Sequence, residues 1–118
     1  MPACGERKKV LDQVNEDNFD AVVLQSKVPV LVDFSATWCG PCRAMEPVLE
    51  EAAAELASRA RIVQVDVDQA PILSRHFGVS GIPCYIVFKN GQEVERASGR
   101  TSKRMILEML LGANFSHG

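Results

Sequence analysis

The sequence has no apolar run that approaches the roughly 20 residues needed to cross a bilayer, so no membrane-spanning segment is predicted. It also has little charge imbalance, because 13 lysine and arginine residues nearly balance 15 aspartate and glutamate residues, giving a net charge of -2. Neither nucleic acid nor an anionic membrane surface is therefore expected as a partner. Internal repeats and low-complexity segments are absent as well. The 118 residues predict one globular domain with a single core.

Residues 1–9 are polar and lack the apolar centre of a secretory signal, so we expect the protein to stay in a reducing cytoplasm. Residues 1–8 are expected to form a flexible arm, residues 9–112 one folded domain and residues 113–118 a C-terminal tail. The sequence has four cysteines and two histidines. In a reducing compartment, closely spaced cysteines are more often catalytic or metal-binding than structural.

Two of the cysteines, Cys39 and Cys42, lie between a predicted strand and a predicted helix. Residues 28–34 are apolar and β-branched, as in a buried strand. In residues 39–57 apolar side chains recur at helical spacing, which predicts a long amphipathic helix. The unpaired N–H groups at a helix start favour an anion, and the thiolate is the nucleophile of thiol chemistry. Cys39 is therefore predicted to be reactive, with Cys42 near enough on the same face to form a reversible disulfide.

The two residues between the cysteines suit this junction, because Pro41 fits the first turn of a helix and Gly40 permits a tight turn before it. A zinc site and an inert structural disulfide are the alternatives for the cysteine pair. A zinc ribbon needs a second closely spaced pair, whereas the other cysteines and histidines are scattered: Cys4, His76, Cys84 and His117. Redox exchange is therefore favoured, and no metal is expected.

The stretch from Trp38 to Cys42 reads Trp-Cys-Gly-Pro-Cys, which matches the active-site signature of the thioredoxin family. The resemblance extends over about residues 10–111 and includes, in order, Asp33, Pro47, Gly81-Ile82-Pro83, Phe88 to Gly91, and Gly99. It implies the thioredoxin fold, an α/β architecture in which a central mixed five-stranded sheet is flanked by four helices in three layers.

The pattern of apolar residues predicts the same architecture. Five strands are expected, over residues 10–14, 28–34, 62–67, 85–88 and 93–97. Four helices are expected, over 19–24 and 39–57, from Pro71 to a stop at Gly78, and from a cap at Ser102 to Gly112, the last with Met105, Ile106, Met109 and Leu110 on its apolar face. Right-handed crossovers are expected to make the early strands parallel. Asn90-Gly91 is a strong turn signal, which predicts a hairpin that adds an antiparallel edge to the sheet.

Asp33 is a carboxylate inside an otherwise apolar predicted strand, where it alternates with Val32 and Phe34. Burial would raise its pKa and make it a proton donor and acceptor near neutral pH. The alternative is a strand-end aspartate bonded to nearby backbone, and the residues alone leave both interpretations open. The family resemblance implies that Asp33 deprotonates Cys42.

Three positions depart from the family pattern. Gln64 stands where a lysine often neighbours the buried aspartate, so we expect a higher pKa for Asp33 than in lysine-containing relatives. Ser35 stands where an aromatic residue is frequent, so looser packing behind the cysteines is expected. Cys84 stands where threonine is common, and it is either a small buried apolar residue or a third thiol near the site.

Ile82 and Pro83 are joined by an X-Pro bond, for which trans is the default. The resemblance implies a cis bond, with Pro83 facing Cys39 and the Ile82 backbone offering strand-like hydrogen bonds to an extended substrate. It also implies a shallow apolar substrate groove formed by Trp38, Gly81, Ile82, Pro83 and Gly99. Taken by itself, Trp38 could equally be a core residue.

The resemblance implies a general protein thiol–disulfide oxidoreductase that reduces client disulfides, in which Cys39 attacks and Cys42 releases the client. Gly40 and Pro41 would tune the redox potential towards reduction. No cofactor is expected, since the dithiol carries the electrons, and an NADPH-dependent thioredoxin reductase would recycle a monomeric protein. The alternatives are an oxidase or isomerase with the same fold, and a non-enzymatic binding subunit or chaperone.

Overall fold

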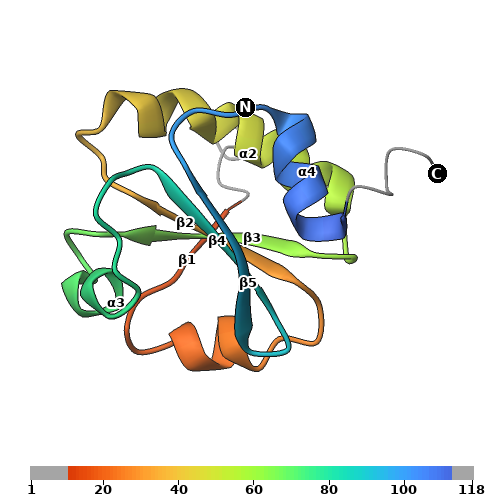
Figure 1. Cartoon of the computed structure of the whole chain (residues 1–118), viewed down its shortest axis with the longest axis horizontal. Helices are drawn as coiled ribbons and strands as arrows, with labels where there is room; N and C mark the ends of the chain where they lie inside the picture. Colours follow the sequence, from red (N-terminus) through yellow and green to blue (C-terminus); the bar gives the residue numbers. More distant parts are fainter. Residues whose placement is uncertain (1–10, 113–118) are drawn as a thin grey trace, which may run out of the picture.

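The computed structural model describes residues 11–112 (Figure 1). The elements in this range are β1 (Asp12–Gln13), the π-helical turn η1 (Asp20–Leu24), β2 (Val30–Ser35), α2 (Gly40–Leu56), β3 (Arg61–Asp66), α3 (Pro71–His76), β4 (Cys84–Lys89), β5 (Gln92–Ser98) and α4 (Lys103–Leu111). The predicted arm over 1–8, the predicted tail over 113–118, Cys4 and His117 lie outside the described residues. Within 11–112, no helix combines the length and the apolar character that a membrane span requires.

The five strands form one mixed sheet in the order β1-β3-β2-β4-β5. β1, β3 and β2 run parallel, whereas β4 is antiparallel to β2, and β5 is antiparallel to β4. This confirms the expected five-stranded sheet. β2 is its central strand, and all six of its residues are buried. The chain therefore passes from the middle of the core directly into the loop that carries the cysteines.

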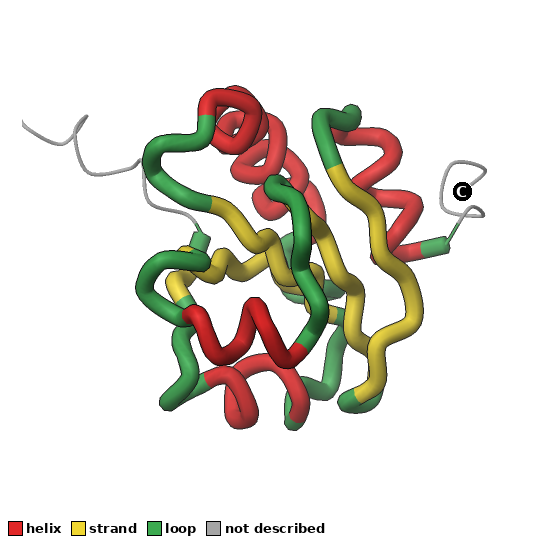
Figure 2. Tube along the Cα trace, turned by 60° about the vertical axis from the view of Figure 1, so that its left-hand side comes forward, coloured by secondary structure: helices red, strands yellow, loops and turns green. Residues whose placement is uncertain are grey.

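Helices cover both faces of the sheet (Figure 2). On the face of α2 and α4 the core includes Leu31, Leu49, Tyr85, Ile106 and Leu110. On the face of η1 and α3 it includes Phe19, Val23, Val32, Leu73 and Ile86. Consecutive residues of β2 alternate between these two cores, because side chains of a strand point to opposite faces. Burial on both faces holds β2 firmly within the fold.

The hairpin between β4 and β5 turns at Asn90 and Gly91, as predicted. Both residues have positive φ angles, 53° and 79°, which two-residue turns of type I′ require. A Cβ atom on Gly91 would lie only 3.0 Å from the backbone oxygen of Leu24. Glycine at position 91 is therefore required both by the turn and by the close approach of η1.

Near the N-terminus, two elements differ from the prediction. The first strand pairs with β3 only at Asp12 and Gln13, before Asn15 begins a turn. The predicted helix over 19–24 is instead a single π-helical turn, in which the N–H of Gln25 donates to the carbonyl of Asp20 over 3.0 Å. Apolar spacing located this helix, but over one turn such spacing does not distinguish α from π winding.

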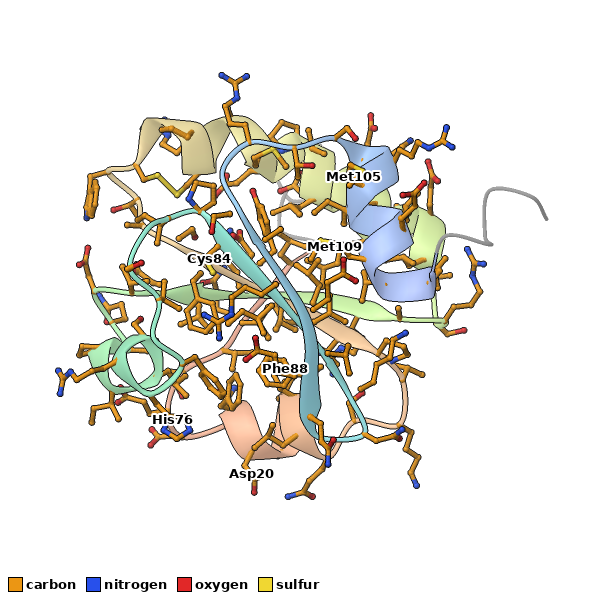
Figure 3. All side chains as sticks on the ribbon, viewed as in Figure 1. Asp20, His76, Cys84, Phe88, Met105 and Met109 are labelled. Atoms are coloured by element: carbon orange, nitrogen blue, oxygen red, sulfur yellow. A yellow bond between two sulfur atoms is a disulfide. The ribbon has the colours of Figure 1, made fainter. Side chains whose placement is uncertain are left out.

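The last helix confirms the predicted cap and corrects one core residue. The hydroxyl of Ser102 accepts a hydrogen bond from the N–H of Met105 over 3.2 Å. Met105 itself is 48% exposed, whereas Met109 is 5% exposed (Figure 3), so placing Met105 on the buried face was wrong. Leu107 is buried instead, because the stripe of α4 that meets α2 and the sheet is centred on Ile106 and Leu110.

Candidate functional site

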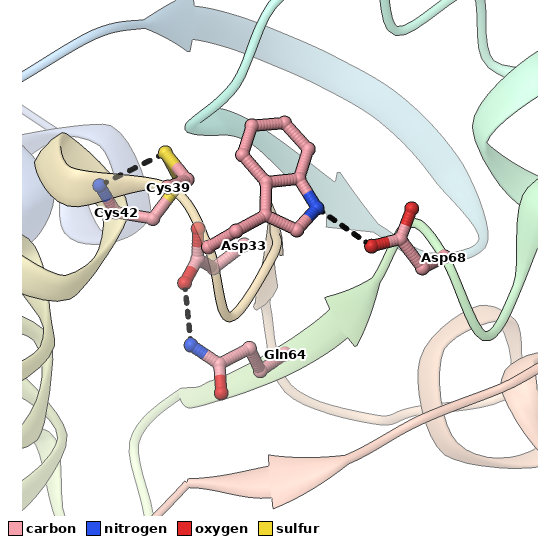
Figure 4. Close-up of a disulfide and its surroundings, with 6 residues drawn as sticks. Asp33, Cys39, Cys42, Gln64 and Asp68 are labelled. Carbon is pink, nitrogen blue, oxygen red and sulfur yellow. Dashed lines mark hydrogen bonds between the residues drawn. A yellow bond between two sulfur atoms is a disulfide. The ribbon is translucent and has the colours of Figure 1, made fainter.

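The two cysteines of the motif lie at the start of α2 (Figure 4). Cys39 is the N-cap residue of the helix, with extended backbone angles. Its sulfur accepts a hydrogen bond from the backbone N–H of Cys42 over 3.2 Å. The two residues form a disulfide, and their Cα atoms are 5.2 Å apart. Because a helix start presents unpaired N–H groups and the positive end of the dipole, this position stabilises negative charge on the Cys39 sulfur.

The disulfide is largely covered by apolar neighbours. Cys39 and Cys42 are 5% and 2% exposed, and they form a small cluster with Ala36. Val67 and Ile82 pack against this cluster from the loops that follow β3 and precede β4. The two sulfurs are therefore mostly screened from water. A negative charge on either sulfur then depends on the N–H groups of the helix start for stabilisation.

Pro41 and Gly40 form the exposed tip of the helix start. Pro41 lies in the first turn of α2, as predicted. Gly40 has a φ outside the left-handed region, and a Cβ atom there would meet no atom within 4 Å. The chain does turn just before Gly40, where the N–H of Cys39 donates to the carbonyl of Ala36 over 3.2 Å, but glycine is not required at position 40, because its backbone would accept other residues without strain.

Asp33 lies in the middle of β2 and is 1% exposed. Its Oδ2 accepts a hydrogen bond from the side-chain amide of Gln64 over 2.9 Å (Figure 4), so the interpretation of a strand-end aspartate bonded to backbone is wrong. Burial raises the pKa of Asp33 from its ordinary 3.8 to about 7. The hydrogen bond from Gln64 opposes this rise, and the negative charge of Glu46 on α2 adds to it. Asp33 is thus able to exchange a proton near neutral pH.

A cleft of about 180 Å³ opens on the Gln64 side of this carboxyl. The cleft is lined by Gln13, Ser35, Ala36, Thr37, Glu46, Gln64 and Asp66. Ser35 is 7% exposed at its wall, where a larger side chain would take up part of the volume. Most of these side chains are polar, so the cleft brings solvent close to the buried carboxyl without exposing it.

Of the predicted groove residues, Ile82 lies against the disulfide, and Pro83 is hydrogen-bonded to Gly99 through the backbone. The peptide bond between Ile82 and Pro83 is cis, as the family resemblance implied. The carbonyl of Pro83 accepts a hydrogen bond from the N–H of Gly99 over 2.9 Å. Ile82 packs on the cysteine cluster, and Gly81, the residue before it, is exposed. Gly99 has a φ of +87°, a backbone conformation that suits glycine.

Trp38 is 69% exposed beside the cysteines, so the interpretation as a core residue is wrong. Its indole N–H donates a hydrogen bond to Oδ2 of Asp68 over 2.7 Å. Asp68 lies on the loop after β3, and sequence reasoning did not select it. An acidic residue in a loop 30 positions away carries no signal of this contact before the fold is known.

Cys84 is buried and is not part of a disulfide. It is packed in the core on the η1 and α3 face of the sheet, and burial raises the pKa of its thiol. This supports the interpretation of Cys84 as a small apolar core residue. Two further residues that sequence reasoning did not connect with the site are Glu46, which acts on Asp33, and Gln13, which bonds Gln64.

The cysteine pair lies at the start of the helix that follows the central strand, and a buried carboxyl with a pKa near neutral lies on that strand. These features define a thiol–disulfide oxidoreductase. Residues 10–111 match the family described as Thioredoxin. The chain belongs to the thioredoxin family, whose reductase activity towards protein disulfides it shares; an oxidase, an isomerase or a binding-only subunit is not favoured.

Similar proteins come from bacteria and from a chloroplast. The chain is 46% identical over 103 residues to a thioredoxin of Mycobacterium tuberculosis, covering 87% of this chain and 89% of the relative. It is 43% identical over 95 residues to the chloroplastic M-type thioredoxin of Chlamydomonas reinhardtii, covering 80% and 68% of the two chains. It is also 46% identical over 98 residues to a bifunctional thioredoxin reductase/thioredoxin of Mycobacterium leprae, covering 83% of this chain and 21% of that protein.

Proposed function

We propose that this protein is a general cytoplasmic reductant of client protein disulfides, with Cys39 as the nucleophile, Cys42 as the resolving thiol and Asp33 as the base. The observation that carries the proposal is the hydrogen bond from the Cys42 N–H to the Cys39 sulfur at the start of α2. That N–H stabilises a thiolate at position 39 more than a thiol, which lowers the pKa of Cys39 in the reduced protein.

In the first step, the Cys39 thiolate attacks one sulfur of the client disulfide. A bond forms between the Cys39 sulfur and that client sulfur, the client disulfide breaks, and the second client sulfur leaves as a thiolate that takes a proton from solvent. Cys42 remains a thiol during this step. Its position one turn further along α2 keeps it within reach of the mixed disulfide.

In the second step, Asp33 takes the proton of the Cys42 thiol, and the resulting thiolate attacks the Cys39 sulfur. The Cys39–Cys42 disulfide forms, the mixed disulfide breaks, and the client leaves with its second sulfur as a thiolate. Two electrons have then passed from the cysteine pair to the client. A carboxyl with a pKa of about 7 can accept the proton and later return it to solvent at neutral pH.

The groove beside the disulfide supplies the contacts for the client. Trp38, Gly81, Ile82, Pro83 and Gly99 are its proposed substrate-binding residues. Ile82 supports this assignment, because it packs directly on the cysteine cluster. An extended client segment laid along the Ile82 backbone would form strand-like hydrogen bonds and place its disulfide over Cys39. Gly40 and Pro41 are proposed to tune the redox potential through the helix start that they form.

The oxidised protein has to be recycled, and the proposed partner is an NADPH-dependent thioredoxin reductase. The M. leprae relative supports this pairing, because its name joins a thioredoxin reductase and a thioredoxin in one chain. A protein that donates electrons from a dithiol works where the cell keeps thiols reduced, which supports the cytoplasm as its compartment. The protein is proposed to act as a monomer.

Reduction of insulin tests this proposal. With dithiothreitol as the electron source, the protein should accelerate insulin reduction, and with NADPH and a thioredoxin reductase it should catalyse NADPH oxidation. The double variant Cys39→Ser, Cys42→Ser should do neither while remaining folded. Equal rates with and without the wild-type protein would overturn the proposal.

A further inference from the structure

Four polar side chains form one row across the sheet. Gln13 on β1 pairs in register with Gln64 on β3, Gln64 pairs with Asp33 on β2, and Asp33 pairs with Tyr85 on β4. Residues in one register row of adjacent strands project from the same face of the sheet. That face is the one on which Tyr85 packs against α2 and α4. The row therefore carries polar groups from an exposed edge strand to the buried carboxyl.

Two hydrogen bonds connect the first three members of the row. The amide nitrogen of Gln13 donates to the side-chain oxygen of Gln64 over 2.7 Å. The amide nitrogen of Gln64 then donates to Oδ2 of Asp33 over 2.9 Å. A glutamine amide can present either its oxygen or its nitrogen to a neighbour, and a carboxylate accepts only from the nitrogen. Because Gln13 engages the oxygen of Gln64, it favours the amide orientation that places the nitrogen against Asp33.

The arrangement leaves one carboxyl oxygen of Asp33 available. Among the described residues, Oδ1 of Asp33 is fully buried and has no hydrogen-bond partner, whereas Oδ2 is bonded to Gln64. Figure 4 shows the Asp33 carboxyl between Gln64 and the disulfide. A carboxyl bonded at one oxygen has a defined orientation, so the other oxygen is held ready for proton exchange.

We propose that Gln64 and Gln13 are positioning residues for Asp33, with Gln64 holding one oxygen of the carboxyl and Gln13 fixing the amide of Gln64, so that the free oxygen serves Cys42. Both act through Asp33, and neither touches the reacting sulfurs. The assignment rests on the proposed role of Asp33 as the base for Cys42. It makes the neutral amide at position 64 an active part of the site, in place of a cation.

Other ionisable groups also act on Asp33 and must be held constant in any test. Glu46 acts on it from α2. Tyr85 lies opposite Asp33 on β4, and Cys84 precedes Tyr85 on the same strand. The cysteine pair lies at the start of α2. None of these groups is altered when Gln13 or Gln64 is replaced, so a change in Asp33 titration can be assigned to the amides.

The test is titration of the Asp33 carboxyl by 13C NMR in the reduced protein, together with the pH profile of insulin reduction. Gln64→Leu removes the only described donor to the carboxylate and should raise the pKa of Asp33 by about one pH unit. Gln13→Ala keeps that donor but frees its orientation, and should produce a smaller rise in the same direction. Gln69→Ala replaces an exposed amide outside the row and serves as the matched control, with no shift expected.

If Asp33 titrates in both variants as it does in the wild type, the positioning role is wrong. If Gln64→Leu does not fold, Gln13→Ala, which alters only an exposed side chain, decides the question by the same criterion. A separate variant, Asp33→Asn, tests the role of Asp33 as the base for Cys42, on which this proposal rests. If Asp33→Asn leaves the pH profile of insulin reduction unchanged, Asp33 is not the base, whereas the NMR shifts in the glutamine variants would still report whether the amides hold the carboxyl.

Discussion

The indole N–H of Trp38 lies 2.7 Å from the carboxylate of Asp68, which ties an exposed aromatic ring beside the cysteines to the loop after β3. A 69% exposed tryptophan would otherwise move freely on its loop. The hydrogen bond to a charged acceptor holds the ring in one orientation beside the cysteines, at the edge of the proposed groove. A client that packs on the ring then meets a surface that is already ordered.

Replacing Asp68 with alanine should therefore weaken client binding, with little effect on the rate of disulfide exchange in the bound complex. Loss of one hydrogen bond worth about 0.5–1.5 kcal/mol predicts a rise in KM for insulin of roughly twofold to tenfold, with kcat little changed. Trp38 is the only tryptophan of the chain, so its fluorescence anisotropy reports ring mobility directly and should fall in the variant. Asp17→Ala, at an exposed carboxylate in another turn, is the control. Unchanged anisotropy and KM in Asp68→Ala would show that the bond does not order the ring.

Removal of the resolving thiol should trap the client. Cys42→Ser leaves Cys39 able to attack but unable to release the mixed disulfide, so a covalent adduct with a disulfide-containing peptide should accumulate. Mass spectrometry should find one peptide on Cys39 per protein. Cys39→Ser should form no such adduct. If Cys39→Ser formed the adduct and Cys42→Ser did not, Cys42 would be the nucleophile and Cys39 the resolving thiol.

The burial of Asp33 predicts a pH-dependent stability. Its pKa in the folded protein is about 7, above the ordinary 3.8, so between these values the folded state holds a proton that the unfolded chain has lost. Stability then falls as pH rises through this window, by about 4 kcal/mol at most. Asp33→Asn has no carboxyl to titrate at this position and does not lose this stability. Its free energy of unfolding, relative to that of the wild type, should therefore increase from pH 4 to pH 8.

Urea unfolding of the oxidised protein at three pH values in this range measures the effect. Asp17→Asn, the same substitution at an exposed carboxylate in a turn, provides the control. A constant difference between Asp33→Asn and the wild type from pH 4 to pH 8 would show that the carboxyl titrates normally in the folded protein.

Two glycines should respond in opposite ways to alanine. Gly91→Ala places a Cβ atom 3.0 Å from the Leu24 backbone oxygen at a φ of +79°, so it should destabilise the protein by at least about 1 kcal/mol. Gly40→Ala meets no atom within 4 Å and should leave stability nearly unchanged. Thermal unfolding compares the two, and equal losses would contradict the backbone description of these turns. A changed reduction potential in Gly40→Ala would support the redox-tuning role.

The features that could be predicted from the sequence are those with a local cause. The helix start at Cys39 and the hairpin at Asn90 and Gly91 each follow from residues that are close in the chain. The residues around Asp33 left open whether its carboxyl is buried with a raised pKa or bonded to nearby backbone. The cis bond before Pro83 followed from family resemblance, since isolated X-Pro bonds favour trans.

The remaining features depend on strand register. Gln13 meets Gln64 across 51 positions, and Gln64 meets Asp33 across 31, so no local pattern marks these contacts. The same holds for Trp38 and Asp68. Met105 was misplaced because a helix of nine residues offers an apolar stripe whose centre is decided by its packing against α2 and the sheet.

The most direct measurement for the whole account is the pH dependence of Cys39 alkylation in the reduced protein, with Cys4 and Cys84 replaced by serine so that only the active pair reacts. Stabilisation of the sulfur by the start of α2 predicts an apparent pKa for Cys39 at least about one unit below the 8.5 of a free cysteine. Rapid alkylation should therefore persist into mildly acidic solution. An apparent pKa of about 8.5 or higher would contradict the account.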